Sequence, residues 1–542
     1  MAMKKKRVYS LMATMMLAAS ILGACSDNKE NKANKASTSG NADNVNATGM
    51  PIAKDKIEVD GFAAKFFASQ DWNSLMLWQE YEKMSNIHIN WTTVQTEVLA
   101  DKKNLLLAAG NYPEIFFASA FSRTDLLKYG QQGVFIPLND YIDKYAPNFK
   151  KLLEEYPTVK QGITMADGNI YGFPTIYDPK FESLRVGAPW INQQWLDKLG
   201  LKSPETTEDL YKVLKAFKEN DPNGNGQQDE QGWGSGYGIK QFIDYLRGSF
   251  GLNKQGTMNP NLDFKEGTEE FRFVPTIDEY KQLLEFLNKL YSEDLINKDV
   301  FTTEPQKFAA EAGKGTFGML SEVDPKELFK LDGYVGAHVL EGPNGDRQYT
   351  AMSNGLGNLG MFVVTDKAKN PEAMVRWIDH LYGDEGAKMF FMGFKGVTYE
   401  EDAAGNVKYV DNITNNPDGK NLDQAISDYL TWPGGYYPGI VTQKYFQGAE
   451  AKENSINNAQ QVMPYALKDE DIIPGLNFTL EENEQVSAIL TDIQTYVDEM
   501  TASFITGKAS FDKWDDYKKT IEKMGLEKYM KVAQAAYDRT KK

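Results

Sequence analysis

The sequence predicts an α/β protein built in two lobes. The chain has 542 residues, several times the usual domain size, so it should form at least two hydrophobic cores. Hydrophobic residues make up 41% of the chain and charged residues 25%, which argues against both disorder and an integral membrane protein. Strands alternate with helices in two separate stretches, a pattern typical of parallel sheets with crossover helices.

The first 25 residues predict export. Residues 4–7 (KKKR) are basic, residues 8–23 are apolar, and the small Ala24 precedes Cys25, the single cysteine of the sequence. This order is that of a signal peptide, expected over residues 1–24. The apolar run is too short to remain as a membrane-spanning helix, and no later segment has enough consecutive apolar residues to span a bilayer.

Residues 22–25 (LGAC) resemble a bacterial lipobox, in which the cysteine thiol is acylated and the cysteine becomes the new N-terminus. We therefore expect Cys25 to carry lipid such as palmitate; the alternative is a plain secretory signal with an incidental cysteine. An acylated Cys25 leaves no thiol for a disulfide within the chain. Residues 25–56 are rich in Asn, Lys, Ser and Ala, which predicts a flexible tether.

The first α/β stretch follows the tether. Apolar and polar residues alternate in its strands and recur at helical spacing between them. In order, the sequence predicts an extended segment at 57–67, a helix at 72–84, a strand at 87–91, a helix at 97–109 and a strand at 114–117. An open parallel sheet of this kind binds ligands at the carboxyl ends of its strands.

A second α/β stretch follows, with interruptions. It comprises a hairpin at 167–174, a strand at 184–190, helices at 193–198, 207–218 and 277–293, and a strand at 315–320. Glycine-rich segments at 354–360 and 393–397 are interpreted as passages between lobes, and residues 480–537 as amphipathic helices. The resulting boundaries are 57–176 with 345–395 for one lobe, and 177–344 with 396–542 for the other.

The overall charge excludes one class of partner. The formal net charge is −17 and the pI about 4.9, so the protein should be soluble and should repel polyanions. Nucleic acid is therefore not an expected partner.

Several motifs occur in a familiar order after the lipobox and tether. Residues 110–115 (GNYPEI), 170–174 (IYGFP) and 195–201 (WLDKLGL) together resemble family 1 extracellular solute-binding proteins of ABC importers, especially the long lipoproteins of Gram-positive bacteria. The resemblance implies a two-lobed, periplasmic-binding-protein-like fold with a hinge and an interlobe cleft for a sugar or oligosaccharide. It also implies a monomer at the extracytoplasmic membrane face, whose closure is read by the permease subunits.

The sharpest local motif is residues 221–230 (DPNGNGQQDE). Alternating oxygen-bearing side chains, with a glycine that permits the turn, can build the oxygen cage that Ca²⁺ prefers. The loop departs from an EF-hand because its closing acid is the tenth residue and no helix follows. It resembles the calcium loop of alginate-binding relatives, which implies a structural Ca²⁺; the alternative is a solvated Asn-Gly turn. The implied ligands are Asp221, Asn223, Asn225, Gln227, Asp229 and Glu230.

Sugar binding needs flat apolar faces for the C–H sides of the rings and planar polar groups for the hydroxyls. Aromatic residues make up 12% of the chain, and each candidate has core packing as its alternative. Arg185 could meet an acidic sugar or form a plain ion pair, whereas Trp78, Trp195 and Trp377 are expected in the core. The candidate ligand-binding residues are Trp72, Tyr177, Arg185, Trp190, Trp233, Trp432, Tyr436 and Tyr437.

No catalytic motif is visible. The three histidines are far apart and show no His-Glu-x-x-His spacing, and neither a Gly-x-Ser-x-Gly elbow nor a phosphate-binding P-loop is present. A carboxylate pair for glycoside hydrolysis cannot be picked out among 76 acidic residues. We therefore predict a binding protein rather than an enzyme. The alternatives are a lipid-anchored glycoside hydrolase and a surface sensing or adhesive protein without an importer.

Overall fold

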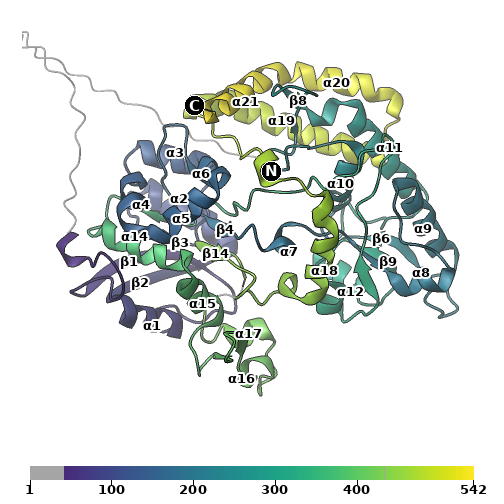
Figure 1. Ribbon diagram of the computed structural model, residues 1–542. Coiled ribbons are helices and arrows are strands. Elements are labelled where there is room, and N and C mark those ends of the chain that lie inside the picture. The colour runs from purple at the N-terminus through teal and green to yellow at the C-terminus, as the bar shows by residue number, and fades with distance from the viewer. Residues whose placement is uncertain (1–41, 432–433, 542) are drawn as a thin grey trace, which may run out of the picture. The chain divides into compact units, whose positions relative to one another are not determined.

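The computed structural model describes residues 42–431 and 434–541, which are arranged around two main sheets (Figure 1). Hydrophobic clusters pack on each sheet, and the larger cluster at each is named the first core and the second core. The predicted signal peptide, the lipid anchor at Cys25 and the candidate Trp432 lie outside the described residues. Within the described part of the chain, every helix is too short or too polar to cross a membrane. The predicted α/β class with two lobes is confirmed.

The first sheet has the strand order β11-β3-β1-β2. The strands β1 (Ile57–Lys65), β2 (Ile87–Gln95) and β3 (Ile115–Phe117) are parallel, and β11 (Phe362–Val364) runs antiparallel to β3. The helices α1 (Met76–Ser85) and α2 (Leu99–Ala108) are the crossovers between the parallel strands. All four predicted elements from 72 to 117 are therefore present, and the carboxyl ends of three strands share one edge.

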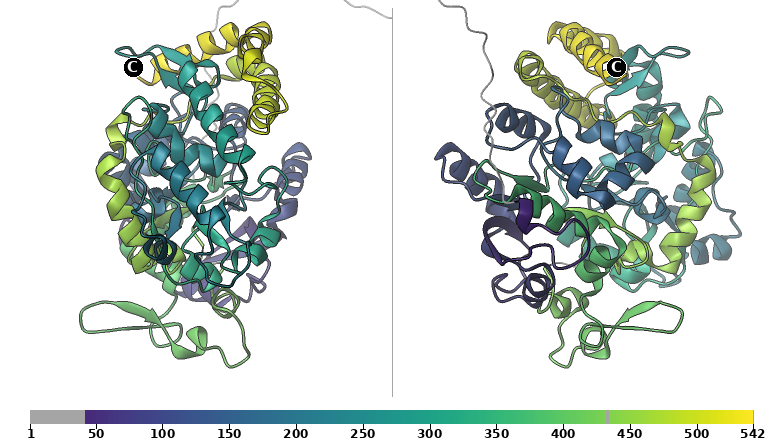
Figure 2. Two further views of the ribbon diagram at one scale, coloured as in Figure 1. Left: turned by 90° about the vertical axis from the view of Figure 1, so that its right-hand side faces the viewer. Right: turned by 60° about the vertical axis from the view of Figure 1, so that its left-hand side comes forward.

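Helices from distant parts of the sequence complete this lobe. They include α3 (Arg123–Gln131), α4 (Asn139–Tyr145), α5 (Pro147–Glu155), α6 (Pro157–Ile163), α14 (Pro371–Asp379) and α15 (Asp384–Met392). The short strands β4 (Thr175–Tyr177) and β14 (Gly439–Val441) pair in parallel. The hairpin β12 (Tyr399–Glu401) and β13 (Val407–Tyr409), with α16 (Asp411–Thr414) and α17 (Leu422–Ile426), lies at the lower end of both views in Figure 2.

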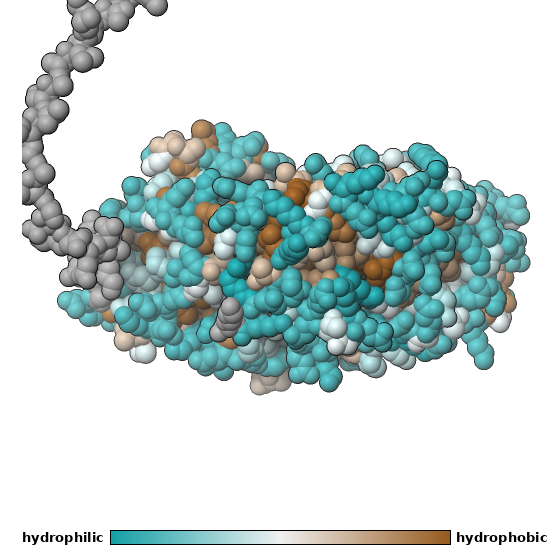
Figure 3. All heavy atoms as spheres, turned by 90° about the horizontal axis from the view of Figure 1, so that it is seen from above, coloured by the Kyte–Doolittle hydropathy of each residue, from teal (hydrophilic) through white to brown (hydrophobic). Residues whose placement is uncertain are grey.

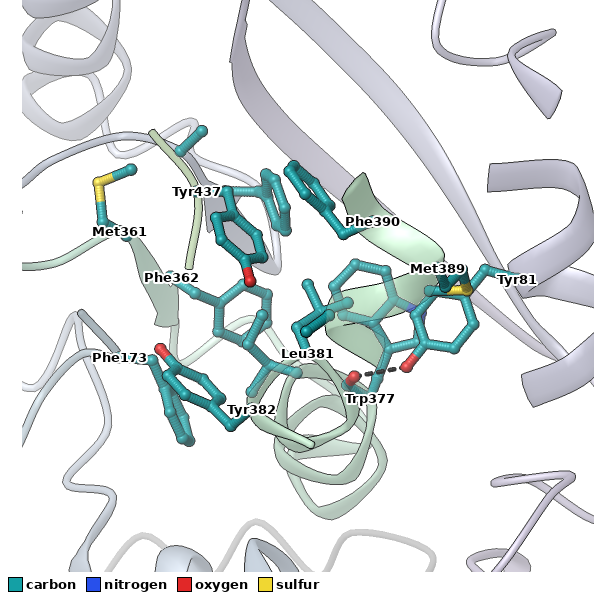
Figure 4. Close-up of a cluster of buried hydrophobic side chains, with 14 of the residues drawn as sticks. Tyr81, Phe173, Met361, Phe362, Trp377, Leu381, Tyr382, Met389, Phe390 and Tyr437 are labelled. Carbon is teal, nitrogen blue, oxygen red and sulfur yellow. Dashed lines mark hydrogen bonds between the residues drawn. The ribbon is translucent and has the colours of Figure 1, made fainter. Parts of the chain in front are cut away.

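Aromatic rings fill the first core. Trp78 lies 5.5 Å from Trp72 and 5.6 Å from Trp377 between ring centroids. Figure 4 shows Tyr81 and Trp377 side by side, where the Tyr81 hydroxyl donates to the Trp377 carbonyl at 2.6 Å. In the same view Tyr437 faces Phe390, with ring centroids 3.9 Å apart. These side chains stabilise the lobe and are almost completely buried.

The second sheet has the order β10-β5-β9-β6. The strands β6 (Gln231–Gly234) and β9 (Phe317–Leu320) are parallel, β5 (Trp190–Asn192) is antiparallel to β9, and β10 (Tyr334–Gly336) is antiparallel to β5. The helices of this lobe are α8 (Gln193–Leu199), α9 (Thr207–Glu219), α10 (Lys240–Leu246), α11 (Asp278–Ser292), α12 (Pro305–Ala312) and α13 (Pro325–Phe329). The hairpin β7 (Leu262–Phe264) and β8 (Phe271–Phe273) adds to its core.

The C-terminal helices α19 (Leu480–Ile505), α20 (Trp514–Lys523) and α21 (Leu526–Thr540) pack on the second core, as the amphipathic pattern predicts. A capping box begins α19: the Thr479 hydroxyl accepts from the Glu482 N–H, and the Glu482 carboxylate accepts from the Thr479 N–H. Figure 3 shows a face that is mostly hydrophilic, with apolar residues gathered in a band across its middle.

The chain passes between the two cores three times. Phe181, Leu356 and Phe446 belong to the first core, whereas Val186, Met352 and Ala459 belong to the second. The crossings therefore lie at 182–185, 353–355 and 447–458, and Figure 1 shows α7 (Glu182–Arg185) and α18 (Glu453–Val462) between the two sheets.

The predicted passage at 393–397 is wrong. Met392 before it and Tyr399 after it both lie in the first core, and a side chain at Gly393 would meet the buried Thr398 and the core residue Leu430. Residues 399–446 pack with the first sheet through Tyr409, Ile413 and Tyr445, so their predicted place in the second lobe is wrong as well.

Three further local predictions need correction. Residues 184–190 were expected as a strand, but α7 ends at Arg185 and β5 starts only at Trp190. The predicted hairpin at 167–174 is a turn at Gly168, after which Phe173 bridges to Phe362. The flexible tether was expected to extend to residue 56, yet Val45, Ile52 and Ala53 are buried in the first core. Their apolar side chains fix the last part of that segment.

Candidate ligand-binding site

A cavity of about 420 Å³ opens at the carboxyl edge of the second sheet. Because β6 and β9 are parallel, the segments that follow them leave the sheet on the same side, where open sheets bind ligands. Tyr237 follows β6, Ser321 and Glu322 follow β9, and Trp190 begins the antiparallel β5 at the same edge. With Tyr245 and Tyr349, which also line it, the cavity has four aromatic residues and several polar groups in its wall.

Two of the three crossings form the opposite wall. Residues 183–189, in and directly after the first crossing, line it together with Glu450, Ser455 and Asn458 of the third. The Ser183 hydroxyl donates to the Glu450 carbonyl at 2.7 Å. The Asn458 amide donates to the Ala188 carbonyl at 2.8 Å and accepts from the Ala188 N–H at 3.1 Å. The crossings are thus tied to each other beside the cavity.

Carboxylates dominate the charge of the cavity. Asp244, Glu322, Asp324 and Glu450 line it. Arg185 is the only cationic side chain among the lining residues in the described part of the chain, and it is paired with Asp469. Its guanidinium also donates to the Ser353 carbonyl of the second crossing at 3.0 Å and to the Pro179 carbonyl at 3.3 Å. Arg185 therefore holds the crossings together.

Glu322 is the most perturbed acid of the cavity. Burial raises the pKa of its carboxyl to about 7, although the Gly236 N–H donates to it at 3.0 Å. The Trp190 indole N–H donates to the Glu322 backbone carbonyl at 3.0 Å. Near neutral pH this carboxyl can therefore act as either a donor or an acceptor toward a ligand.

The structure brings together two of the predicted ligand-binding residues, Trp190 and Arg185, as lining residues of the cavity. Trp190 is only 4% exposed and also packs in a buried cluster on the second sheet, so a small part of its side chain borders the cavity. The alternative interpretation of Arg185, an ion pair, is present as the contact with Asp469. Trp78, Trp195 and Trp377 are buried, as expected for core residues.

Three predicted ligand contacts are instead core residues. Trp72 is 2% exposed within the first aromatic core, and Tyr437 is fully buried against Phe390. Trp233 is fully buried too, with its indole N–H donating to the Ser321 hydroxyl at 2.9 Å behind the cavity. Each lies beside a turn in the sequence, but long-range packing covers its ring.

Tyr177 and Tyr436 are half-buried against the first core and do not line the cavity. Sequence reasoning missed Tyr237, Glu322, Asp244 and Asn458, which do line it. A usable signal existed for Tyr237, since it stands in a Gly-Ser-Gly-Tyr-Gly run directly after a strand.

The loop at 221–230 is curled around its own carboxylates. Asp221 accepts from the backbone N–H groups of Gly224, Asn225 and Gly226 at 2.7 to 3.1 Å. The side-chain amides of Asn223 and Asn225 donate to Asp229 at 2.9 to 3.1 Å. The left-handed φ values of Gly224 and Gly226, 77° and 74°, permit this path.

The environment of the Glu230 carboxylate indicates whether a cation would fit in the loop at 221–230. Both of its carboxylate oxygens are buried without a hydrogen bond of ordinary geometry. Burial raises its pKa, and the carboxylates of Asp221 and Asp229 raise it further. No group of three or more His, Cys, Asp or Glu side chains is gathered as a metal cluster in the described ranges. The loop instead combines two surface carboxylates and amide groups with one buried, unpaired carboxylate.

Two α/β cores joined by three crossings, with a cavity against those crossings, define a two-lobed binding protein. The chain belongs to the bacterial extracellular solute-binding proteins, whose family profile matches residues 70–388.

The relatives are similar in sequence and in structure. The fructooligosaccharide ABC transporter substrate-binding protein FusA of Streptococcus pneumoniae is 30% identical over 554 aligned residues, 98% of each chain. The polygalacturonan/rhamnogalacturonan-binding protein YtcQ of Bacillus subtilis is 28% identical over 60% of this chain and 63% of its own. The structure of FusA in complex with kestose has a TM-score of 0.71 at 28% identity, covering 89% of this chain and 99% of that one.

Proposed function

We propose that this protein captures a neutral oligosaccharide outside the cell and delivers it to the permease of an ABC importer. The observation that carries the proposal is the cavity at the carboxyl edge of the second sheet, where Trp190 and Tyr237 stand among acidic and amide side chains. Family membership and similarity to FusA support transport of an oligosaccharide.

The charges of the cavity favour a neutral sugar. Hydroxyl groups donate to carboxylates such as Glu450 and Glu322, whereas a uronate would be repelled by them. Arg185 could attract an acidic sugar only by giving up Asp469 and the backbone carbonyls that it holds. YtcQ, named for binding acidic polysaccharides, is therefore expected to differ from this protein in its cavity charges.

Closure of the lobes would complete the site. Phe67 is 72% exposed just after β1, at the carboxyl edge of the first sheet. A rotation about the crossings can bring such an edge over a sugar held by the second lobe, in the usual hinge motion of binding proteins. The closed form would then be the form that the permease recognises.

Titration calorimetry on the mature chain tests the proposal with neutral and acidic oligosaccharides of matched length. We expect binding of a neutral class, little affinity for uronates and no cleavage of the ligand on long incubation. Trp190→Ala should abolish most binding, and Trp190→Phe, which keeps an aromatic face, should restore part of it. Cleavage of the glycan would instead support the glycoside hydrolase alternative.

We further propose that the loop at 221–230 holds a structural Ca²⁺. Asp221, Asp229 and Glu230 would supply carboxylates, Asn223 and Asn225 amide oxygens, and Gln227 its backbone carbonyl. A cation would compensate the buried Glu230 carboxylate. One solved relative is a FusA EF-hand mutant, and another is the alginate-binding protein AlgQ2 without calcium ion.

Glu230→Gln tests this assignment through stability. Calcium should raise the melting temperature of the wild type over that in chelator, and should leave the variant unchanged. Glu266→Gln, at an exposed position outside the loop, is the matched control and should respond as the wild type does. Equal calcium responses in all three proteins would remove the metal assignment.

The membrane anchor is proposed on the sequence alone. Cys25 would be acylated after removal of residues 1–24, tethering the protein at the extracytoplasmic face as a monomer. Cys25→Ser should release the protein into the culture medium and abolish incorporation of labelled palmitate. Retention of the variant in the membrane fraction would contradict the proposal.

A further inference from the structure

A second cavity of about 460 Å³ adjoins the candidate ligand-binding site. The two cavities share Tyr237 and Glu322. The second one lies against α12 and α13 and is mostly apolar. Its lining residues are Tyr237, Pro305, Phe308, Ala309, Gly313, Glu322, Leu328 and Phe329.

Exposed apolar side chains gather at this place. Tyr237 is 60% exposed, Leu328 49% and Val323 36%, which is unusual for large apolar residues of one neighbourhood. Val323 lines the first cavity and Leu328 the second, so Tyr237 stands at their junction. An apolar surface that continues from a proposed sugar site suits the C–H faces of further sugar rings.

The segment that carries Tyr237 is held against α12. An added side-chain carbon at Gly236 would lie 3.0 Å from the Phe308 ring, so glycine permits the close approach. The Tyr237 N–H donates to the Ser235 hydroxyl at 3.1 Å, and the Gly236 N–H to Glu322. On the other side, the Asp324 carboxylate accepts from the Lys326 N–H at 2.9 Å and starts α13. Both rims of the junction are therefore fixed.

We infer that the ligand is an oligosaccharide long enough to run from the first cavity past Tyr237 into the second, with Tyr237 as the stacking platform between them. This inference rests on the proposed function. Each cavity alone falls in the lower part of the range of about 300–1,000 Å³ for ligand sites. Glu322 is the only ionisable side chain besides Tyr237 that lines the second cavity in the described residues, so an anionic partner finds no cationic contact there.

The test is a chain-length series measured by calorimetry on the full mature chain. The probes are fructo-, malto- and cello-oligosaccharides of two to seven units, preceded by an array of neutral and acidic glycans that identifies the class bound. In the wild type we expect affinity to rise with length after the first cavity is filled. Tyr237→Ala should weaken binding of every length, because Tyr237 also lines the first cavity, and the loss should be about five- to tenfold greater for the longest members than for the shortest.

Two further variants make the result specific. Ala309→Trp fills the second cavity and should remove the length dependence, whereas Tyr237→Phe should keep it. Leu105→Ala, at a 64% exposed position outside both cavities, is the control and should behave as the wild type. Glycan binding without length dependence, or an equal loss for short and long members in Tyr237→Ala, would overturn the inference alone. Failure of every glycan to bind would overturn the proposed function together with the inference.

Discussion

Glu322 should make the ligand-free protein less stable at high pH. Its carboxyl is enclosed by the cavity wall and receives one hydrogen bond, from the Gly236 N–H. Burial raises its pKa from the ordinary value of 4.5 to about 7. Since the unfolded chain loses this proton at lower pH than the folded protein, ionisation favours unfolding between these two values.

The size and sign of the effect follow from the two pKa values. A difference between 4.5 and about 7 corresponds to about 3 kcal/mol, at about 1.4 kcal/mol per pKa unit. Below pH 4.5 both states are protonated and the cost is absent. It grows as the pH rises toward 7 and is complete above that value. Glu322→Gln removes the titrating group and preserves the shape of the side chain, so it should stabilise the protein only at neutral and alkaline pH.

Thermal unfolding of wild type and Glu322→Gln at intervals from pH 5 to pH 9 measures this effect. The difference in Tm should be small at pH 5 and reach several degrees at pH 9, because about 1 kcal/mol moves Tm by about 2–4 °C in a domain of about 150–250 residues. Glu484→Gln, at an exposed position of α19, is the control and should change little at any pH. A difference between Glu322→Gln and wild type that stays constant across the range would refute the reasoning.

Three other substitutions probe the hinge, the first lobe and its core. Asp469→Asn leaves the Arg185 guanidinium, 6% exposed, without its charge partner and should lower stability by about 1–3 kcal/mol in urea unfolding; an unchanged midpoint would contradict the assigned role. Phe67→Ala should weaken sugar binding at constant Tm, and equal affinity would exclude Phe67 from the closed site. Burial lowers the pKa of His380 to about 4, so stability should fall as pH drops below about 6.5. His380→Phe should reduce that loss between pH 7.5 and pH 5 if the ring is as enclosed as its stacking on Tyr81 indicates.

Local patterns were sufficient for most of the secondary structure. The apolar spacing of 207–218 and 277–293 corresponds to α9 and α11, and Gly315 stands two residues before β9 as expected. Which segments cross between the two cores depends on long-range packing, and local patterns do not contain this information. The glycines at 354–360 and 393–397 look alike in sequence, but only the first segment lies between residues of different cores.

In the candidate site, too, some features follow from local sequence and others from long-range packing. Trp190 and Trp233 both belong to strands of the second sheet, and nothing local separates them. Trp233 is covered by Phe242 of α10 at 4.4 Å between ring centroids, whereas Trp190 reaches the cavity. Which face a helix covers is a property of the folded lobe. The loop at 221–230, proposed to hold Ca²⁺, could be singled out from the sequence because its oxygen-bearing residues lie within ten consecutive positions.

The cavity and the hinge share the same residues, and this sharing links ligand binding to motion. Arg185 lines the cavity from the first crossing while it holds the Ser353 carbonyl of the second and Asp469 beyond the third. Ser183 of the first crossing donates to the Glu450 carbonyl of the third, and Asn458 of the third is bonded to Ala188, three residues after the first. A sugar that fills the cavity would therefore touch the segments about which the lobes are proposed to rotate. If the sugar makes better contacts with these segments in the closed arrangement than in the open one, it shifts the equilibrium between the two arrangements toward closure. The shift then needs no chain of side-chain movements through either core.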